Sequence, residues 1–169
     1  LKNPADYDFR LPIYSRIPVD TAVEQLVGSD IVLFSTYVWN FRISLEIARQ
    51  LKGRAPATTI VFGGPHVPNR AEEFLRKHPF IDLACHGEGE AVAVAVLENC
   101  VANRWQDVPS VSYLDGAGDL VVTPRAKRIG DLSAIPSPYL SGVFAPLIAA
   151  HPDEQWIAMW ETNRGCPFS

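Results

Sequence analysis

Three short, largely apolar runs alternate with amphipathic segments through the first hundred residues, and this alternation constrains the fold more than any other feature. The runs lie at residues 31–34, 59–62 and 81–84, and continuous apolar runs of this length are typical of strands that are covered on both faces. The intervening segments place apolar residues at helical spacing, which predicts helices over residues 41–52 and 90–103. Such alternation predicts parallel strands joined by right-handed helical crossovers.

Weaker signals mark other elements. Residues 9–14 are predicted to form a strand, at an edge or irregular because Pro12 has no backbone N–H. A short helix is expected over residues 20–27, capped by the aspartate at its start. Asn69 and Glu72 resemble a capping box, which predicts a helix that begins there and stops near the following proline.

The pattern changes after the first hundred residues. Residues 110–123 contain two strand-like runs around a glycine-containing loop, which predicts a hairpin. A proline-rich stretch follows and predicts an extended connector, after which residues 156–160 are expected to begin the first strand of another domain. The predicted domains are therefore residues 1–130, a connector over 131–154, and the start of a second domain at 155–169.

Each of the three apolar runs is followed by a loop of unusual composition, at residues 35–40, 63–66 and 86–90. In an open parallel sheet, ligands bind beyond the carboxyl ends of the strands, so we expect these loops to line one pocket. Glycines in the second and third loops allow a backbone to approach a bulky ligand closely. A tight turn without a ligand and a polar helix start remain the alternatives for these two loops.

Trp39 is an unusual residue for a turn, where small polar side chains are preferred. A flat aromatic side chain at the mouth of a pocket suits packing against a flat ligand or the exclusion of water. The alternative is a tryptophan that fills the interface between helix and sheet. The two glutamates of the third loop count against a strongly anionic ligand, although free backbone N–H groups at a helix start accept amide carbonyls or phosphates.

Charge and composition exclude several classes of function. Fifteen basic and nineteen acidic residues give a net charge of −4 without a basic stripe, which argues against nucleic acid as a partner. No apolar stretch is long enough for a membrane span and no signal peptide is recognisable, and the three cysteines are far apart. We therefore expect a cytoplasmic protein with reduced thiols. Metal-ligand spacing and a nucleophile elbow are both missing, which argues against zinc and hydrolase chemistry.

Taken in order, the three loops resemble the cobalamin-binding domain of cobalamin-dependent radical S-adenosylmethionine (SAM) enzymes. Residues 131–139 resemble the link between that domain and the radical barrel, and residues 161–169, which include Arg-Gly-Cys-Pro, resemble the approach to the CxxxCxxC cluster motif. The resemblance covers nearly the whole chain. It implies an α/β, flavodoxin-like (Rossmann-like) parallel sheet with helices on both faces, with a small hairpin and the connector at the C-terminal side.

The same resemblance implies a set of site residues and cofactors. Cys166 would be the first of three thiolate ligands of a 4Fe–4S cluster, with SAM on the remaining iron and the other two cysteines beyond Ser169. No residue of this chain is assigned as a catalytic acid or base. The residues implied to contact cobalamin are Ser35, Thr36, Tyr37, Val38, Trp39, Asn40, Gly63, Gly64, Pro65, His66, Val67, His86, Gly87, Glu88, Gly89 and Glu90.

Two departures from the family pattern carry predictions. The Asp-x-His-x-x-Gly motif that supplies a histidine to cobalt elsewhere is missing, so we predict cobalamin bound without a protein histidine on cobalt and with Trp39 near its lower face. Family members also begin with a strand and a helix before the segment that here starts at Phe9. Lacking them, the sheet is expected to have a gap in its middle, and residues 1–169 are not expected to fold alone.

The function implied by the resemblance is a methyltransferase that methylates an unreactive carbon of a small-molecule or peptide substrate through methylcobalamin and a 5′-deoxyadenosyl radical, with an external electron donor. A related alternative uses cobalamin for ring contraction, cyclisation or electron transfer without methyl transfer. Alternatives from other classes are a non-catalytic cobalamin carrier or sensor, and a receiver or nucleotide-binding module. The context of Cys166 argues against the carrier, and the lack of an acidic cluster argues against the receiver.

Overall fold

The chain folds into two compact units, which are described separately. The structure is a computed structural model and describes residues 1–159. The first unit comprises Leu1–Asp8 and Ile13–Gly130, and the second comprises Phe9–Pro12 and the chain from Asp131 onward. The domain limits predicted from the sequence stay a prediction.

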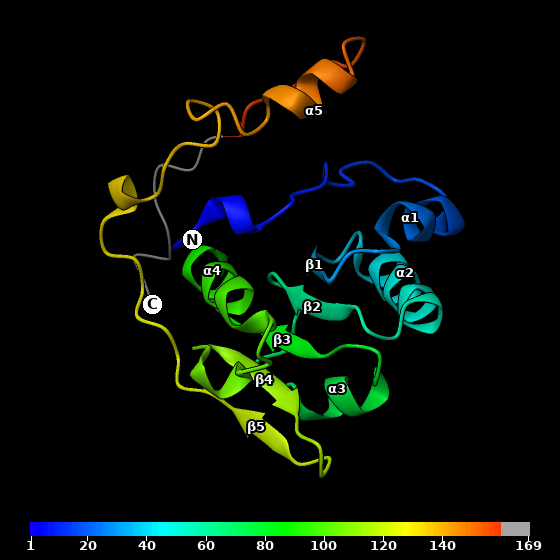
Figure 1. Cartoon of the computed structure of the whole chain (residues 1–169), viewed down its shortest axis with the longest axis vertical. Coiled ribbons are helices and arrows are strands. Elements are labelled where there is room, and N and C mark those ends of the chain that lie inside the picture. The colour runs from blue at the N-terminus through cyan, green and yellow to red at the C-terminus, as the bar shows by residue number, and fades with distance from the viewer. Residues whose placement is uncertain (160–169) are drawn as a thin grey trace. The chain divides into compact units, whose positions relative to one another are not determined.

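The first unit is built on a five-stranded sheet. Its strands are β1 (Ile31–Ser35), β2 (Thr59–Gly63), β3 (Leu83–Cys85), β4 (Val111–Leu114) and β5 (Leu120–Val122) (Figure 1). β1, β2 and β3 pair in parallel, as predicted, and the structure places them in chain order; β4 and β5 add the predicted hairpin to the same sheet in antiparallel direction. The whole sheet is therefore mixed, and the part that carries the three loops, β1 to β3, is parallel.

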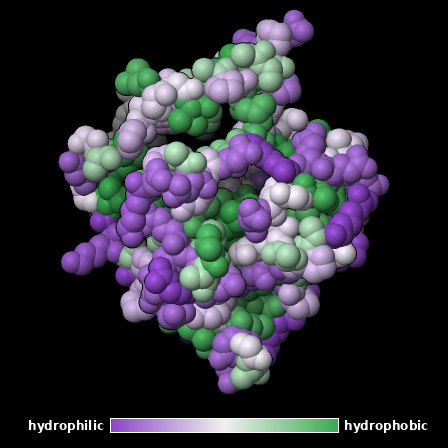
Figure 2. All heavy atoms as spheres, viewed as in Figure 1, coloured by the Kyte–Doolittle hydropathy of each residue, from purple (hydrophilic) through white to green (hydrophobic). Residues whose placement is uncertain are grey.

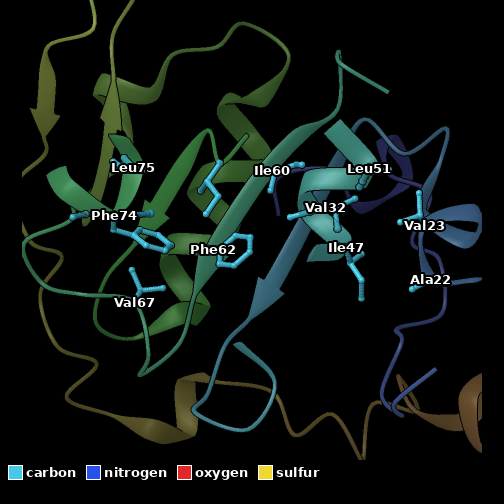
Figure 3. Close-up of a cluster of buried hydrophobic side chains, with 14 residues drawn as sticks. Ala22, Val23, Val32, Ile47, Leu51, Ile60, Phe62, Val67, Phe74 and Leu75 are labelled. Atoms are coloured by element: carbon cyan, nitrogen blue, oxygen red, sulfur yellow. The ribbon is translucent and has the colours of Figure 1, made fainter. Parts of the chain in front are cut away.

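Helices cover both faces of the sheet, as predicted. They are α1 (Val19–Leu26), α2 (Phe41–Arg54), α3 (Glu72–Lys77) and α4 (Gly89–Cys100). Ile60 and Phe62 on β2 belong to a core shared with α2 and α3, whereas Val61 between them belongs to a second core shared with α4. Because side chains alternate along a strand, the two cores lie on opposite faces. Figure 3 shows the first core, in which Phe62 lies against Phe74 of α3 with ring centroids 6.1 Å apart.

The predicted strand at residues 9–14 is wrong, because these residues form no strand. Pro12 has no N–H to donate to a ladder, and the chain passes from the second unit to the first immediately after it. Ile13 and Ile17 pack their side chains against the first core instead. The predicted gap in the middle of the sheet is also wrong, because β1, β2 and β3 pair directly and β1 lies at an edge.

The predicted cap of α1 is wrong as well. The helix begins after Pro18, whose side chain cannot cap it, and Asp20 lies within the first turn. The Asp20 carboxylate lies 3.5 Å from the guanidinium of Arg54 at the end of α2. Asp20 therefore helps to join α1 to α2 rather than closing the start of its own helix.

α3 begins later than predicted. Its N-cap is Ala71 and makes no side-chain hydrogen bond, so the capping box of Asn69 and Glu72 does not form. Asn69 accepts a hydrogen bond from Arg125 at 3.2 Å instead. The Asn69 side chain, which the local pattern predicts to cap the helix, therefore bonds to a residue 56 positions away.

The second unit contains α5 (Ala145–Ala150), so the predicted connector is not extended throughout. Residues 156–159 form no strand, which contradicts that part of the prediction for residues 156–160; Trp160 lies outside the described residues. Hydrophobic side chains remain exposed in this unit, and Figure 2 shows them in green on its upper segment. None of the helices in residues 1–159 is long and apolar enough to cross a membrane.

Candidate functional site

The first two loops are joined at the carboxyl edge of the sheet. Ser35 is in register with Gly63, and the backbone N–H and the hydroxyl of buried Thr36 both donate to the carbonyl of Gly63, at 2.8 and 2.7 Å. His66 N–H in turn donates to the carbonyl of Thr36 at 3.2 Å. Gly64 has φ +95°, and a Cβ on it would lie 2.6 Å from the Thr36 carbonyl oxygen. Only glycine therefore allows these loops to approach so closely.

The loop after β1 is closed by its own side chains. Asn40 Oδ1 accepts from Tyr37 N–H at 2.7 Å, and Asn40 Nδ2 donates to the Ser35 carbonyl at 2.9 Å. Tyr37 and Trp39 stack with ring centroids 4.7 Å apart and planes 9° apart. Val38 and Trp39 are each 75% exposed. Trp39 does not fill the interface between helix and sheet, so that alternative is wrong.

The loops after β2 and β3 form the two sides of a pocket of about 290 Å³. All its lining side chains are uncharged when histidine is neutral, and Gly87, with φ +75°, has no atom within 4 Å of where a Cβ would lie. The lining residues are Gly64, Pro65, Val67, Asn69, Cys85, His86 and Gly87. The pocket thus presents backbone and neutral polar groups to a ligand.

His86 is buried beside this pocket and is held from two directions. Its Nε2 lies 2.8 Å from Ser112 Oγ on β4, and its backbone N–H donates to the Ser110 carbonyl at 2.9 Å. Burial, and secondarily the guanidinium of Arg125, lowers the pKa of His86 to about 4. The imidazole is therefore neutral at physiological pH.

The acidic part of the third loop is tied to the irregular segment that follows the hairpin. Glu88 Oε2 accepts a hydrogen bond from Ile129 N–H at 2.7 Å. Gly89 begins α4, and Glu90 lies in its first turn, where a carboxylate is favourable to the helix dipole. The carboxylate of Glu88 is thus partly satisfied within the protein.

The two cysteines of this unit, Cys85 and Cys100, are both half-buried. Burial raises the pKa of the Cys85 thiol to about 12, and Cys100 Sγ lies 3.0 Å from the carbonyl of Leu97 within α4. Cys166, the predicted cluster ligand, lies outside the described residues. Among residues 1–159, no group of three histidine, cysteine or acidic side chains is arranged to hold a metal ion.

Sequence reasoning missed several residues of this pocket. Asn69 and Cys85 line it from positions just outside the predicted loops. Ser112 and Arg125, more than 20 residues beyond the last predicted loop, do not line the pocket but bond to the lining residues His86 and Asn69. Proximity to a loop signal would have found Asn69 and Cys85, but no local pattern points to Ser112 or Arg125.

Comparison with known proteins identifies the family. Residues 11–97 match the model of the B12 binding domain. The chain is 41% identical over 169 residues to the cobalamin-dependent radical SAM methyltransferase TokK of Streptomyces tokunonensis, covering 98% of this chain and 25% of that protein. It is 38% identical, with the same coverage, to 2-(S-pantetheinyl)-carbapenam-3-carboxylate methyltransferase of Streptantibioticus cattleyicolor.

The solved structures give the same picture for the fold. The cobalamin-dependent S-adenosylmethionine radical enzyme OxsB, with aqua-cobalamin and S-adenosylmethionine bound, superimposes with a TM-score of 0.61 at 19% identity, covering 75% of this chain and 18% of that one. The chain spans about a quarter of the length of the curated relatives it matches. The family match covers β1 to β3 and the three loops, and it supports cobalamin binding. The chain belongs to the B12-binding domain family.

Proposed function

We propose that this chain is the cobalamin-binding part of a cobalamin-dependent radical SAM methyltransferase. The observation that carries the proposal is the 41% identity to TokK along 98% of the chain. The proposed substrate is a small molecule or peptide with an unreactive carbon, and an external donor would supply electrons. SAM and a 4Fe–4S cluster are further proposed cofactors, with Cys166 as the first cluster ligand.

The residues at the carboxyl edge fit cobalamin. Its corrin ring is broad and flat and carries neutral amide groups, which require hydrogen-bonding groups rather than counter-charges. The pocket lining supplies neutral polar groups and exposed glycine backbone, including Gly87 with open space above its Cα. At about 290 Å³ the pocket accommodates part of such a ligand, and the neighbouring loop 35–40 offers a further surface.

The proposed task of the loop after β1 is to present a dry, flat surface. The rings of Tyr37 and Trp39 are stacked and exposed, which suits contact with a macrocycle and exclusion of water from it. Bound cobalamin would supply the methyl-carrying chemistry, and the protein would supply orientation and exclusion of solvent.

No described histidine is offered as a cobalt ligand in this proposal. His86 is buried with Nε2 beside Ser112 Oγ, and His66 lies with its ring centroid 4.3 Å from that of Phe41. We therefore expect cobalamin to be bound without a protein histidine coordinated to its cobalt.

The test is an optical spectrum of the full-length protein, purified without oxygen, with cobalamin available and the cluster reconstituted. We expect a base-off corrin spectrum together with a cluster band, and we expect Cys166→Ala to lose the cluster band and keep the corrin. With SAM and a reductant, formation of both S-adenosylhomocysteine and 5′-deoxyadenosine would support methyl transfer. A folded protein that retains no corrin would refute the proposal, and 5′-deoxyadenosine alone would favour the non-methylating alternative.

A further inference from the structure

The chain after the hairpin runs beside the third loop and is fixed there by its backbone. Ser110 N–H donates to the carbonyl of Pro124 at 2.8 Å, and Ala126 N–H donates to Ser110 Oγ at 2.7 Å. Further along, Ile129 N–H donates to Glu88 of the loop itself. Arg125 lies between these anchors, so its backbone is held close to the pocket by bonds that do not involve its side chain.

The side chain of Arg125 reaches across to the loop after β2. Its Nη2 donates to Oδ1 of Asn69, one of the residues that line the pocket, at 3.2 Å. Its positive charge is also felt by His86 on the opposite side of the pocket. The guanidinium is therefore at the rim of the pocket, between the loops that form its two sides.

The charge of Arg125 is not neutralised by an acidic partner. Within residues 1–159 no carboxylate lies within ion-pair distance of this guanidinium. The nearby carboxylate of Glu88 accepts from Ile129 N–H, and the pocket lining itself is uncharged. A guanidinium has five N–H donors, of which the bond to Asn69 uses one. The rim thus carries a positive charge with unused donors beside a neutral pocket.

This arrangement matches one part of cobalamin in particular. The corrin periphery carries neutral amides, whereas the nucleotide tail is attached through a phosphodiester that is negatively charged at all physiological pH values. A planar guanidinium binds phosphate oxygens through two parallel hydrogen bonds, which are stronger than neutral ones. A single phosphodiester is also compatible with the glutamates of the third loop, which disfavour only a strongly anionic ligand.

We propose that Arg125, positioned by Asn69, binds the phosphodiester of the cobalamin nucleotide tail at the rim of this pocket. The inference rests on the proposed cobalamin-binding function and adds to it a specificity-determining residue that lies outside the three loops. It predicts that Arg125 discriminates cobalamin from cobinamide, a corrinoid that lacks the nucleotide and its phosphodiester.

The chain supplies matched controls for this residue. Arg128 is also exposed and lies three positions along the same segment, so Arg128→Gln removes the same charge without removing the bond to Asn69. Arg125→Gln removes the charge at the rim, and Arg125→Lys keeps the charge but loses the planar fork. Asn69→Ala removes the hydrogen bond that positions the guanidinium.

The experiment measures dissociation constants for cobalamin and for cobinamide by spectroscopic titration of the full-length protein. We expect Arg125→Gln to weaken cobalamin binding about 10- to 100-fold, the range of a lost charge-assisted hydrogen bond, and to change cobinamide binding less than about twofold. Arg125→Lys and Asn69→Ala should fall between wild type and Arg125→Gln, and Arg128→Gln should resemble wild type. Added inorganic phosphate should compete with cobalamin in wild type more than chloride at equal ionic strength.

Each contrary outcome has a definite meaning. If wild-type protein binds cobalamin and Arg125→Gln binds it equally well, the role of Arg125 is refuted and the proposed function stands. If Arg125→Gln loses cobalamin and cobinamide to the same degree, Arg125 is a structural residue and the inference is again refuted. If the folded wild-type protein binds neither corrinoid, the proposed function and this inference both fail. Should Arg125→Gln not fold, Arg125→Lys and Asn69→Ala decide by the same ratio of cobalamin to cobinamide affinity.

Discussion

The loop after β1 and the pocket between the loops after β2 and β3 share one edge of the sheet but differ in the chemical character of their surfaces. The loop exposes apolar side chains, with Val38 and Trp39 each 75% exposed. The pocket instead offers glycine backbone and neutral polar groups, and its histidine is 5% exposed. The contrast indicates that the two regions would contact different parts of a ligand, a flat apolar surface at the loop and polar groups at the pocket.

The two regions also differ in how they are held. The loop after β1 is closed locally, by Asn40 bonding to residues three and five positions away. The pocket is braced by distant residues, with Ser112 26 positions from His86 and Arg125 56 positions from Asn69. Changes in the loop should therefore alter ligand contacts at little cost to the fold, whereas changes around the pocket should affect stability.

The largest effect is expected at Gly64, where the two regions meet. Gly64→Ala places a Cβ 2.6 Å from the Thr36 carbonyl oxygen at a positive φ, and we expect a loss of about 3 kcal/mol in the free energy of unfolding. Gly87→Ala is the matched control, because φ is also positive but no atom lies within 4 Å of the Cβ, so its cost should be about 1 kcal/mol. Urea unfolding measures both. Equal losses would show that the close approach of the loops does not matter.

An effect of similar size, confined to acidic pH, is expected from the titration of His86. Its pKa of about 4 in the folded protein lies below the ordinary value of 6.5, so between these pH values the unfolded chain binds a proton that the folded protein does not. The stabilisation is complete above pH 6.5 and is lost as the pH falls toward 4, by up to about 3 kcal/mol.

The measurement is the free energy of unfolding against pH for wild type and for His86→Asn. Because burial also lowers the pKa of His78, the informative quantity is the difference between the two curves. We expect the slope between pH 6.5 and 4 to be shallower in His86→Asn. Parallel curves would mean that His86 is not the buried neutral group that the pocket requires.

The smallest effect on stability is expected at Trp39. Because its side chain is largely exposed, Trp39→Ala should change the free energy of unfolding by less than about 0.5 kcal/mol. Trp105→Ala, the matched control, should cost more than about 1 kcal/mol, because Trp105 packs against the second core.

Trp39→Ala should instead change the optical spectrum and the affinity of bound cobalamin, since water would gain access to the corrin. A wild-type spectrum and unchanged turnover in this variant would refute the proposed role of the aromatic surface. A large loss of stability would refute the contrast between the locally closed loop and the braced pocket.

The strands that carry the loops were predictable because their signal is local. Apolar runs such as residues 31–34 and 59–62 have few stable alternatives to a covered strand, and the structure has β1 and β2 there. The strand predicted at residues 9–14 failed because its apolar residues found other partners, with Ile13 packed against the first core. A pattern of apolar residues specifies burial, but it does not specify whether the backbone pairs.

The polar residues also divide into those whose partners are local in sequence and those whose partners are distant. Asn40 closes its own loop through neighbours that are visible in the sequence. Asn69 carried an equally plausible local signal, but the structure assigns its side chain to Arg125. A polar side chain bonds to whichever partner the fold brings within reach. A capping pattern covers only a few neighbouring residues, so it does not predict a hydrogen-bond partner from another part of the chain.

The sequence by itself determined the order of strands and helices, the α/β class and the three loops at one edge, because each depends on periodicity and composition over a few neighbouring residues. Only the tertiary structure decided that Trp39 is exposed, that Asn69 faces Arg125, and that His86 is buried beside Ser112. The contact of His86 with Ser112 follows from the pairing of β3 with β4, and the contact of Asn69 with Arg125 likewise joins residues far apart in the chain, so neither distance exists before the sheet has formed.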